Sequence, residues 1–123
     1  MILLGIDEAI NTHESFIRVN IRDLDYVDDT SLVIAKFKRE DLSFYNKEHL
    51  LAVEVNALED FILLINTNAK YAICSKELAP TLQKCADAYL TDIKVVVMID
   101  SIEELKWVAQ KEIDGAISFH HLA

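Results

Sequence analysis

Residues 94–119, KVVVMIDSIEELKWVAQKEIDGAISF, decide the fold that the sequence predicts. Their first part, residues 94–100, is a short apolar run rich in valine, and such runs are typical of strands covered on both faces. Residues 102–114 then carry apolar side chains at helical spacing, and residues 116–119 form a second apolar run. The stretch therefore predicts a strand, a helix and a second strand in direct succession.

Capping signals predict where the helices begin and end. Ser101 stands three residues before Glu104, and Asn56 stands three residues before Glu59. Each pair has the spacing of a capping box, which satisfies the first free amides of a helix. Gly115 follows residues 102–114 at the position expected of a left-handed C-terminal cap. Both helices are therefore expected to begin immediately after a strand.

The same alternation extends toward the middle of the chain. Residues 50–56 and 71–75 are further apolar runs, and residues 57–66 and 76–90 carry helical periodicity after them. A strand, a crossover helix and a parallel strand join with right-handed connections. These segments therefore predict a parallel sheet with helices packed against it.

The N-terminal third gives a different prediction. Residues 16–22 alternate between apolar and polar side chains, and residues 30–37 read as another strand. The acidic connector at residues 23–29 is too short for a helical crossover, so these two strands are expected to pair antiparallel. Residues 1–6 can add an edge strand.

The fold class expected from these segments is a small three-layer α/β/α domain. Its sheet is mainly parallel and flavodoxin-like, with an antiparallel N-terminal hairpin. The chain of 123 residues predicts a single domain, with N-terminal strands at 1–37 and repeating βα units at 38–123. A half-length relative of a (β/α) barrel would give the same local pattern, and chain length favours the open sheet.

Composition excludes several classes of function. The formal net charge is −9, from 21 acidic against 12 basic residues, which disfavours nucleic acids and anionic membranes as partners. The glycines, Gly5 and Gly115, cannot supply a phosphate loop, a dinucleotide fingerprint or a nucleophile elbow. No apolar run approaches the length that crosses a bilayer. Cys74 and Cys85 lie in apolar segments, which fits a reducing, cytoplasmic setting.

A ligand site is expected at the carboxyl ends of the parallel strands, because helix N-termini with free amides converge there. The candidate ligand-binding residues at this edge are Lys38, Asn56, Ser75, Asp100, Ser101 and His120. They suit a small anionic ligand, held by the helix amides after Ser75 and Ser101. Helix capping alone would also account for Asn56, Ser75 and Ser101.

No metal and no cofactor are expected. Adjacent residues of an extended segment point opposite ways, and His120 and His121 have no further ligand at metal-site spacing. The sequence carries no catalytic constellation, so whether the chain is an enzyme stays open.

Two functions are compatible with these observations. The first is a non-catalytic interaction or regulatory module that binds a protein partner or associates with itself. Trp107 supports it, since this residue falls off the apolar stripe of its predicted helix and aromatic residues are enriched at interfaces. The alternative is a protein or enzyme that binds an anionic metabolite at the carboxyl edge of the sheet.

Overall fold

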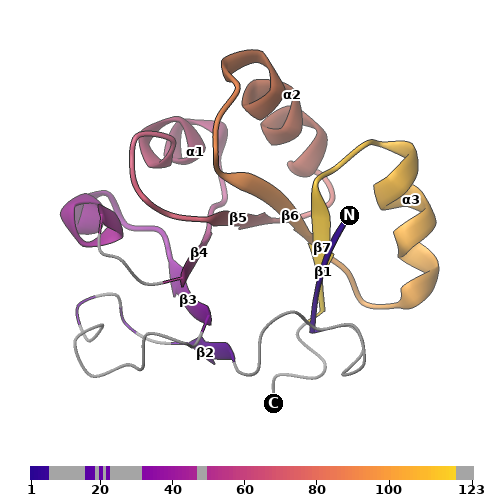
Figure 1. Cartoon of the computed structure of the whole chain (residues 1–123), viewed down its shortest axis with the longest axis horizontal. Helices are drawn as coiled ribbons and strands as arrows, with labels where there is room; N and C mark the ends of the chain where they lie inside the picture. Colours follow the sequence, from indigo (N-terminus) through magenta and orange to yellow (C-terminus); the bar gives the residue numbers. More distant parts are fainter. Residues whose placement is uncertain (6–15, 19, 21, 23–31, 47–49, 119–123) are drawn as a thin grey trace.

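The computed structural model describes residues 1–5, 16–18, 20, 22, 32–46 and 50–118. These residues form one seven-stranded sheet with short helices between the later strands (Figure 1). The strands are β1 (Ile2–Leu4), β2 (Phe16–Arg18), β3 (Leu32–Lys36), β4 (Leu50–Glu54), β5 (Tyr71–Cys74), β6 (Lys94–Met98) and β7 (Gly115–Ile117). The helices are η2 (Arg39–Asn46), α1 (Leu58–Leu64), α2 (Ala79–Tyr89), η3 (Ile102–Glu104) and α3 (Leu105–Gln110).

All neighbouring strands of the sheet pair parallel, in the order β1-β7-β6-β5-β4-β3-β2. The predicted α/β class, with the parallel sheet and βα units of a small flavodoxin-like domain, is confirmed. The antiparallel hairpin is wrong, because β2 and β3 also pair parallel, with Phe16 opposite Leu32. Both strands are shorter than predicted, so residues 19–31 connect them. This connection is longer than the predicted connector at residues 23–29, whose shortness was the reason for expecting a hairpin.

The strands from β2 to β7 follow one another in chain order, and the sheet curls (Figure 1). When each right-handed crossover leads to the next strand in the same direction across the sheet, all of the crossover helices lie on one face. In Figure 1, α1, α2 and α3 all lie on the convex side. The second helical layer of a three-layer domain is not among the described residues. A segment of a (β/α) barrel has the same sequential strand order, with its helices on the convex side.

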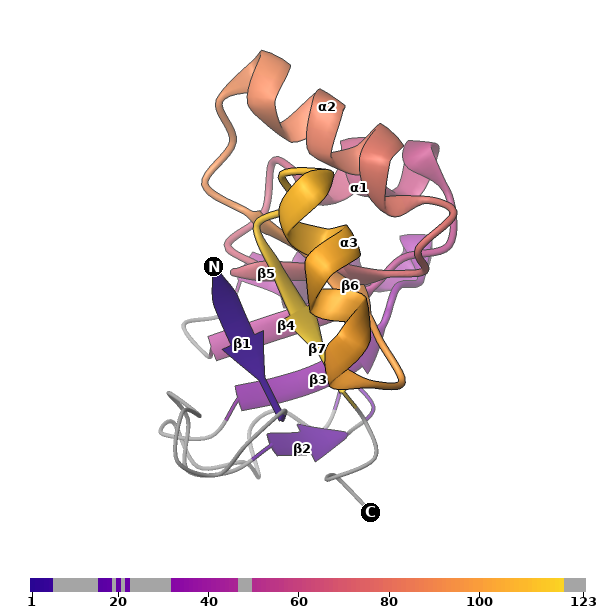
Figure 2. The ribbon, with the colours of Figure 1, turned by 90° about the vertical axis from the view of Figure 1, so that its right-hand side faces the viewer.

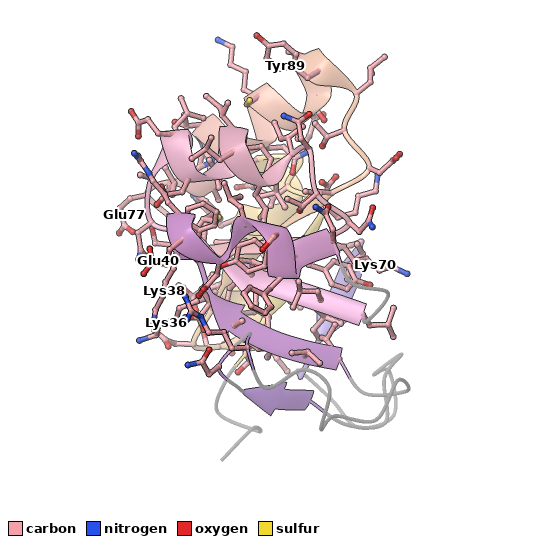
Figure 3. All side chains as sticks on the ribbon, turned by 90° about the vertical axis from the view of Figure 1, so that its left-hand side faces the viewer. Lys36, Lys38, Glu40, Lys70, Glu77 and Tyr89 are labelled. Carbon is pink, nitrogen blue, oxygen red and sulfur yellow. The ribbon has the colours of Figure 1, made fainter. Side chains whose placement is uncertain are left out.

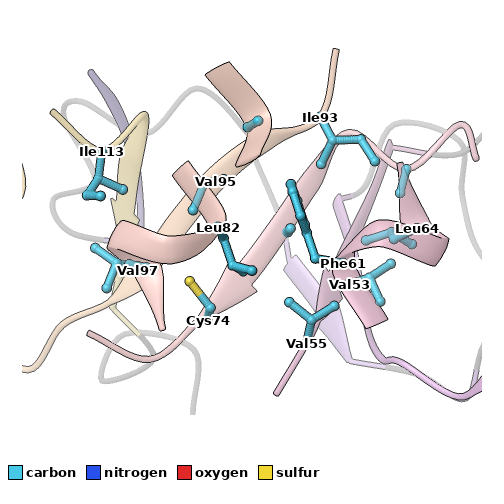
Figure 4. Packing of buried hydrophobic residues seen from close by; sticks show 14 of the residues in the cluster. Val53, Val55, Phe61, Leu64, Cys74, Leu82, Ile93, Val95, Val97 and Ile113 are labelled. Carbon is cyan, nitrogen blue, oxygen red and sulfur yellow. The ribbon is translucent and has the colours of Figure 1, made fainter. Parts of the chain in front are cut away.

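The core has two parts, one on each face of the sheet. On the convex face, Phe61 and Leu82 pack among strand residues such as Val53, Cys74 and Val95 (Figure 4). On the concave face, the buried cluster comes from strands alone: Leu4, Leu32, Ile34, Ala52, Tyr71, Ile73, Val96 and Ile117. Burial on both faces explains why the strands read as continuous apolar runs.

The predicted helix starts are correct at one strand and wrong at another. Ser101 and Glu104 form the expected capping box at the start of η3. Asn56 does not cap α1, because the N-cap is Ala57 and no side chain caps this helix. Ala57 is still extended, at φ −150° and ψ 153°, so the helix begins one residue later than the sequence pattern indicates.

Gly115 has a different role from the one predicted. It lies in β7, and the left-handed residue after α3 is Glu112, at φ 56°. A Cβ atom on Gly115 would collide with the carbonyl oxygen of Ile2. Glycine is therefore required here by the close approach of β1, which no local pattern could show.

Candidate functional site

The carboxyl ends of β3, β4 and β5 bring three of the predicted residues into one row. Lys36 is paired with Glu54, and Glu54 with Ile73. The ladder continues beyond these pairs, since the amides of Phe37 and Val55 donate to the carbonyls of Glu54 and Ile73 at 2.9 Å. Lys38, Asn56 and Ser75 each stand two residues beyond a paired position of this ladder. Neighbouring strands lie about 4.8 Å apart, and Asn56 follows the strand that lies between those of Lys38 and Ser75.

A buried tyrosine fixes the backbone at the end of β3. Tyr45 is fully buried in η2, and its ring stacks on Phe37 at a centroid distance of 5.7 Å. Its hydroxyl accepts a hydrogen bond from the Lys38 amide at 2.9 Å and lies 3.3 Å and 3.4 Å from the carbonyl oxygens of Lys36 and Lys38. Burial raises the pKa of Tyr45, so the phenol keeps its proton. The backbone of residues 36–38 is therefore held by hydrogen bonds to a buried side chain of η2.

The side chains of Lys36 and Lys38 are exposed (Figure 3). Neither ammonium group has a carboxylate partner within the described part of the chain. Asn56 is also exposed, and its amide has no hydrogen-bond partner among the described residues. Two carboxylates lie nearby, Glu54 beside Lys36 in the register and Glu40 at the same end of the strands in Figure 3.

The carboxyl end of β6 has its polar groups joined to one another. The Glu104 carboxylate accepts hydrogen bonds from the amides of Asp100 and Ser101, the latter at 2.9 Å. Lys76 lies 3.2 Å from the same carboxylate and 5.0 Å above the ring of Trp107. These two amides, followed by Lys76, lower the pKa of Glu104. The amides of Asp100 and Ser101 are therefore already bound to a carboxylate of the chain. The amides expected to hold an anion come after Ser101, in the first turn of η3, and that turn carries the carboxylates of Glu103 and Glu104.

The six predicted residues thus divide into groups. Ser101 belongs to the capping box, and Ser75 accepts a hydrogen bond from the Leu78 amide at 3.4 Å. Asp100 is exposed, with its amide bound to Glu104, and His120 lies outside the described residues. In the described hydrogen bonds, the side chains of Lys38 and Asn56 cap no helix. Ser75 lies in the same row, although its hydroxyl accepts the Leu78 amide.

Sequence reasoning missed Lys36 and Tyr45. The signal for Lys36 was present, because residues two apart in a strand share a side and Lys36 precedes Lys38 by two. Nothing local indicated Tyr45, whose hydroxyl reaches the segment at residues 36–38 only through the packing of η2 on the sheet.

Cys74 is not suited to act as a nucleophile. Cys74 is buried in β5, and burial raises the pKa of its thiol to about 12, so the reactive thiolate is absent near neutral pH. Cys85 is a free, half-buried thiol in α2. In the part of the chain that the structure describes, no three metal-ligating side chains come together.

Comparison with known proteins identifies no relative. No protein-family model, curated protein or solved structure matches this chain. None of the described helices combines the length and apolar character needed to span a bilayer.

Proposed function

We propose that this chain is a non-catalytic interaction module that binds a second copy of itself through the end of α2. The observation that carries this proposal is the exposure of two consecutive apolar residues, Tyr89 at 74% and Leu90 at 87%. In Figure 2, α2 lies at the opposite end of the molecule from β2, and Figure 3 shows Tyr89 at that outer end. We call this pair the α2 tip.

The conformation of Leu90 supports a contact function. Leu90 caps α2 in the left-handed region, at φ 51° and ψ 46°. That conformation costs an L-residue about 1–2 kcal/mol, and glycine normally occupies it. The exposed side chain gains no burial in return. Places where a sequence departs from a local structural rule without local compensation tend to be functional sites.

The α2 tip also replaces Trp107 as the proposed contact. Trp107 is half-buried against the convex core, and Lys76 covers its ring. Tyr89 stands seven residues, about two helical turns, after Leu82 in α2, but of the two only Leu82 is buried in the core. Tyrosine is enriched at interface centres, and a two-fold contact needs only one such patch.

Sedimentation velocity over a range of concentrations tests this proposal. The wild-type chain is expected to dimerise, and Tyr89→Ser is expected to weaken the dimer. Leu90→Gly is the sharper variant, because glycine relieves the left-handed cap and should raise the free energy of unfolding by about 1 kcal/mol while weakening the dimer. Ile102→Ser is the matched control, since Ile102 is 62% exposed on η3.

Two results would contradict the proposal. One is a wild-type chain that stays monomeric at every concentration. The other is a dimer that Tyr89→Ser and Leu90→Gly leave as tight as Ile102→Ser does.

A further inference from the structure

We propose that the carboxyl ends of β3, β4 and β5 bind a phosphate group through Lys36, Lys38, Asn56 and Ser75. This edge is separate from the α2 tip, so the inference stands or falls independently of the proposed interaction. We call these four residues the β3–β5 edge.

The chemistry of the four side chains is what selects an anion. Lys36 and Lys38 supply ammonium groups without partners in the described chain, and Asn56 supplies an unbonded amide. The Ser75 hydroxyl accepts from the Leu78 amide, so its own hydrogen is available to donate outward. All four groups can donate hydrogen bonds, which is the requirement for holding a phosphate oxygen.

The geometry brings these donors within reach of one group. Lys36 and Lys38 are two residues apart along an extended segment, so their side chains share a side and their Cα atoms lie about 6–7 Å apart. Lys38, Asn56 and Ser75 follow one another across three adjacent strand ends. A tetrahedral anion can therefore contact both ammonium groups and at least one neutral donor.

The segment that carries this pair of lysines is held in place by a side chain of the core. The Tyr45 hydroxyl is hydrogen-bonded to the backbone on both sides of the segment, at Lys36 and Lys38. The backbone therefore does not have to become ordered when an anion binds, which reduces the cost of binding. Lys70 is exposed at the other end of the strands (Figure 3), where its backbone is hydrogen-bonded to Leu51 and Lys94 and no core side chain contacts it in the described hydrogen bonds.

Nearby carboxylates set the limits of the site. Glu54 and Glu40 lie near the lysines and oppose an anion there. At the end of β6, the first turn of η3 carries Glu103 and Glu104, whose negative charges oppose an anion at the amides of that turn. The phosphate is therefore expected at the β3–β5 edge and not at the start of η3.

The test is a titration of the full chain with inorganic phosphate, followed by backbone amide NMR shifts against sodium chloride of equal ionic strength. Saturable shifts are expected at the ends of β3, β4 and β5. Each charge-assisted hydrogen bond contributes about tenfold to affinity, so the double variant Lys36→Gln/Lys38→Gln should weaken binding by at least tenfold. Lys70→Gln, the matched control, should leave the titration unchanged.

Two further variants separate positioning from charge. Tyr45→Phe removes the hydroxyl and should weaken phosphate binding while the amide spectrum stays that of a folded chain. Glu40→Gln removes an opposing charge and should tighten binding.

Three results would overturn the inference. Shifts that chloride reproduces would show screening alone. A titration unchanged in the double lysine variant would place the anion elsewhere. Succinate binding as tightly as phosphate would show a site that recognises charge and not a phosphate group.

Discussion

The carboxyl ends of β3 and β4 and the carboxyl end of β6 carry similar residues that are used in opposite ways. At β6, Ser101 and Glu104 are joined in a capping box, and Glu104 also binds Lys76, which follows β5. At β3 and β4, Lys36, Lys38 and Asn56 have no side-chain partner within the described residues. Position at a strand end therefore does not by itself indicate function. What separates the two is whether the polar groups are already satisfied.

The largest effect is expected at Tyr45, whose hydroxyl holds the backbone at the end of β3. Tyr45→Phe keeps the buried ring but leaves the Lys38 amide without its acceptor. The variant loses this bond to a partly buried amide and also the bond that the hydroxyl donates to a carbonyl oxygen, at about 0.5–1.5 kcal/mol each. We expect the free energy of unfolding to fall by the sum, as measured by chemical denaturation. An unchanged denaturation midpoint would show that water replaces the hydroxyl and that the segment at residues 36–38 is not held by it.

A smaller, pH-dependent effect is expected at Glu104, on the satisfied side. Glu104→Ala removes the acceptor of the capping box, at about 1 kcal/mol. Because the pKa of Glu104 is lowered in the folded state, its carboxylate contributes fully above the ordinary value of 4.5. That contribution is lost as pH falls through the lowered pKa.

Denaturation of the wild-type chain and Glu104→Ala at several pH values measures this difference. The gap between the two should be widest near neutral pH and should close in acid. A gap that is constant with pH would show that the carboxylate charge contributes nothing to the cap.

The fold was predictable where the signal is local. The valine run at residues 95–97 predicted a strand buried on both faces, and the Ser101–Glu104 spacing predicted the start of η3. The parallel pairing of β2 with β3 was not predictable in this way. The relative direction of two strands depends on the path of the connection between them, which no local pattern specifies. The role of Gly115 depends on β1, at the other end of the chain.

The candidate site was predictable in part for the same reason. The rule that ligands bind beyond the carboxyl ends of parallel strands selected Lys38, Asn56 and Ser75, which the register then aligned. It also selected Ser101, because a serine at a strand end looks the same whether it caps a helix or faces a ligand. Only the hydrogen bonds of Glu104 and Tyr45 distinguish the two, and these depend on tertiary packing.

The smallest effect is expected at Asn56, and it is the most direct test of the comparison. Asn56 is exposed and does not cap α1, so Asn56→Ala should change the free energy of unfolding by no more than about 0.5 kcal/mol. Ser101→Ala, at the first residue of the motif with the same spacing after β6, should cost about 1 kcal/mol through loss of its cap. Parallel denaturation curves measure both. A cost at Asn56 as large as that at Ser101 would mean that Asn56 is structural after all, and the two strand ends would no longer differ.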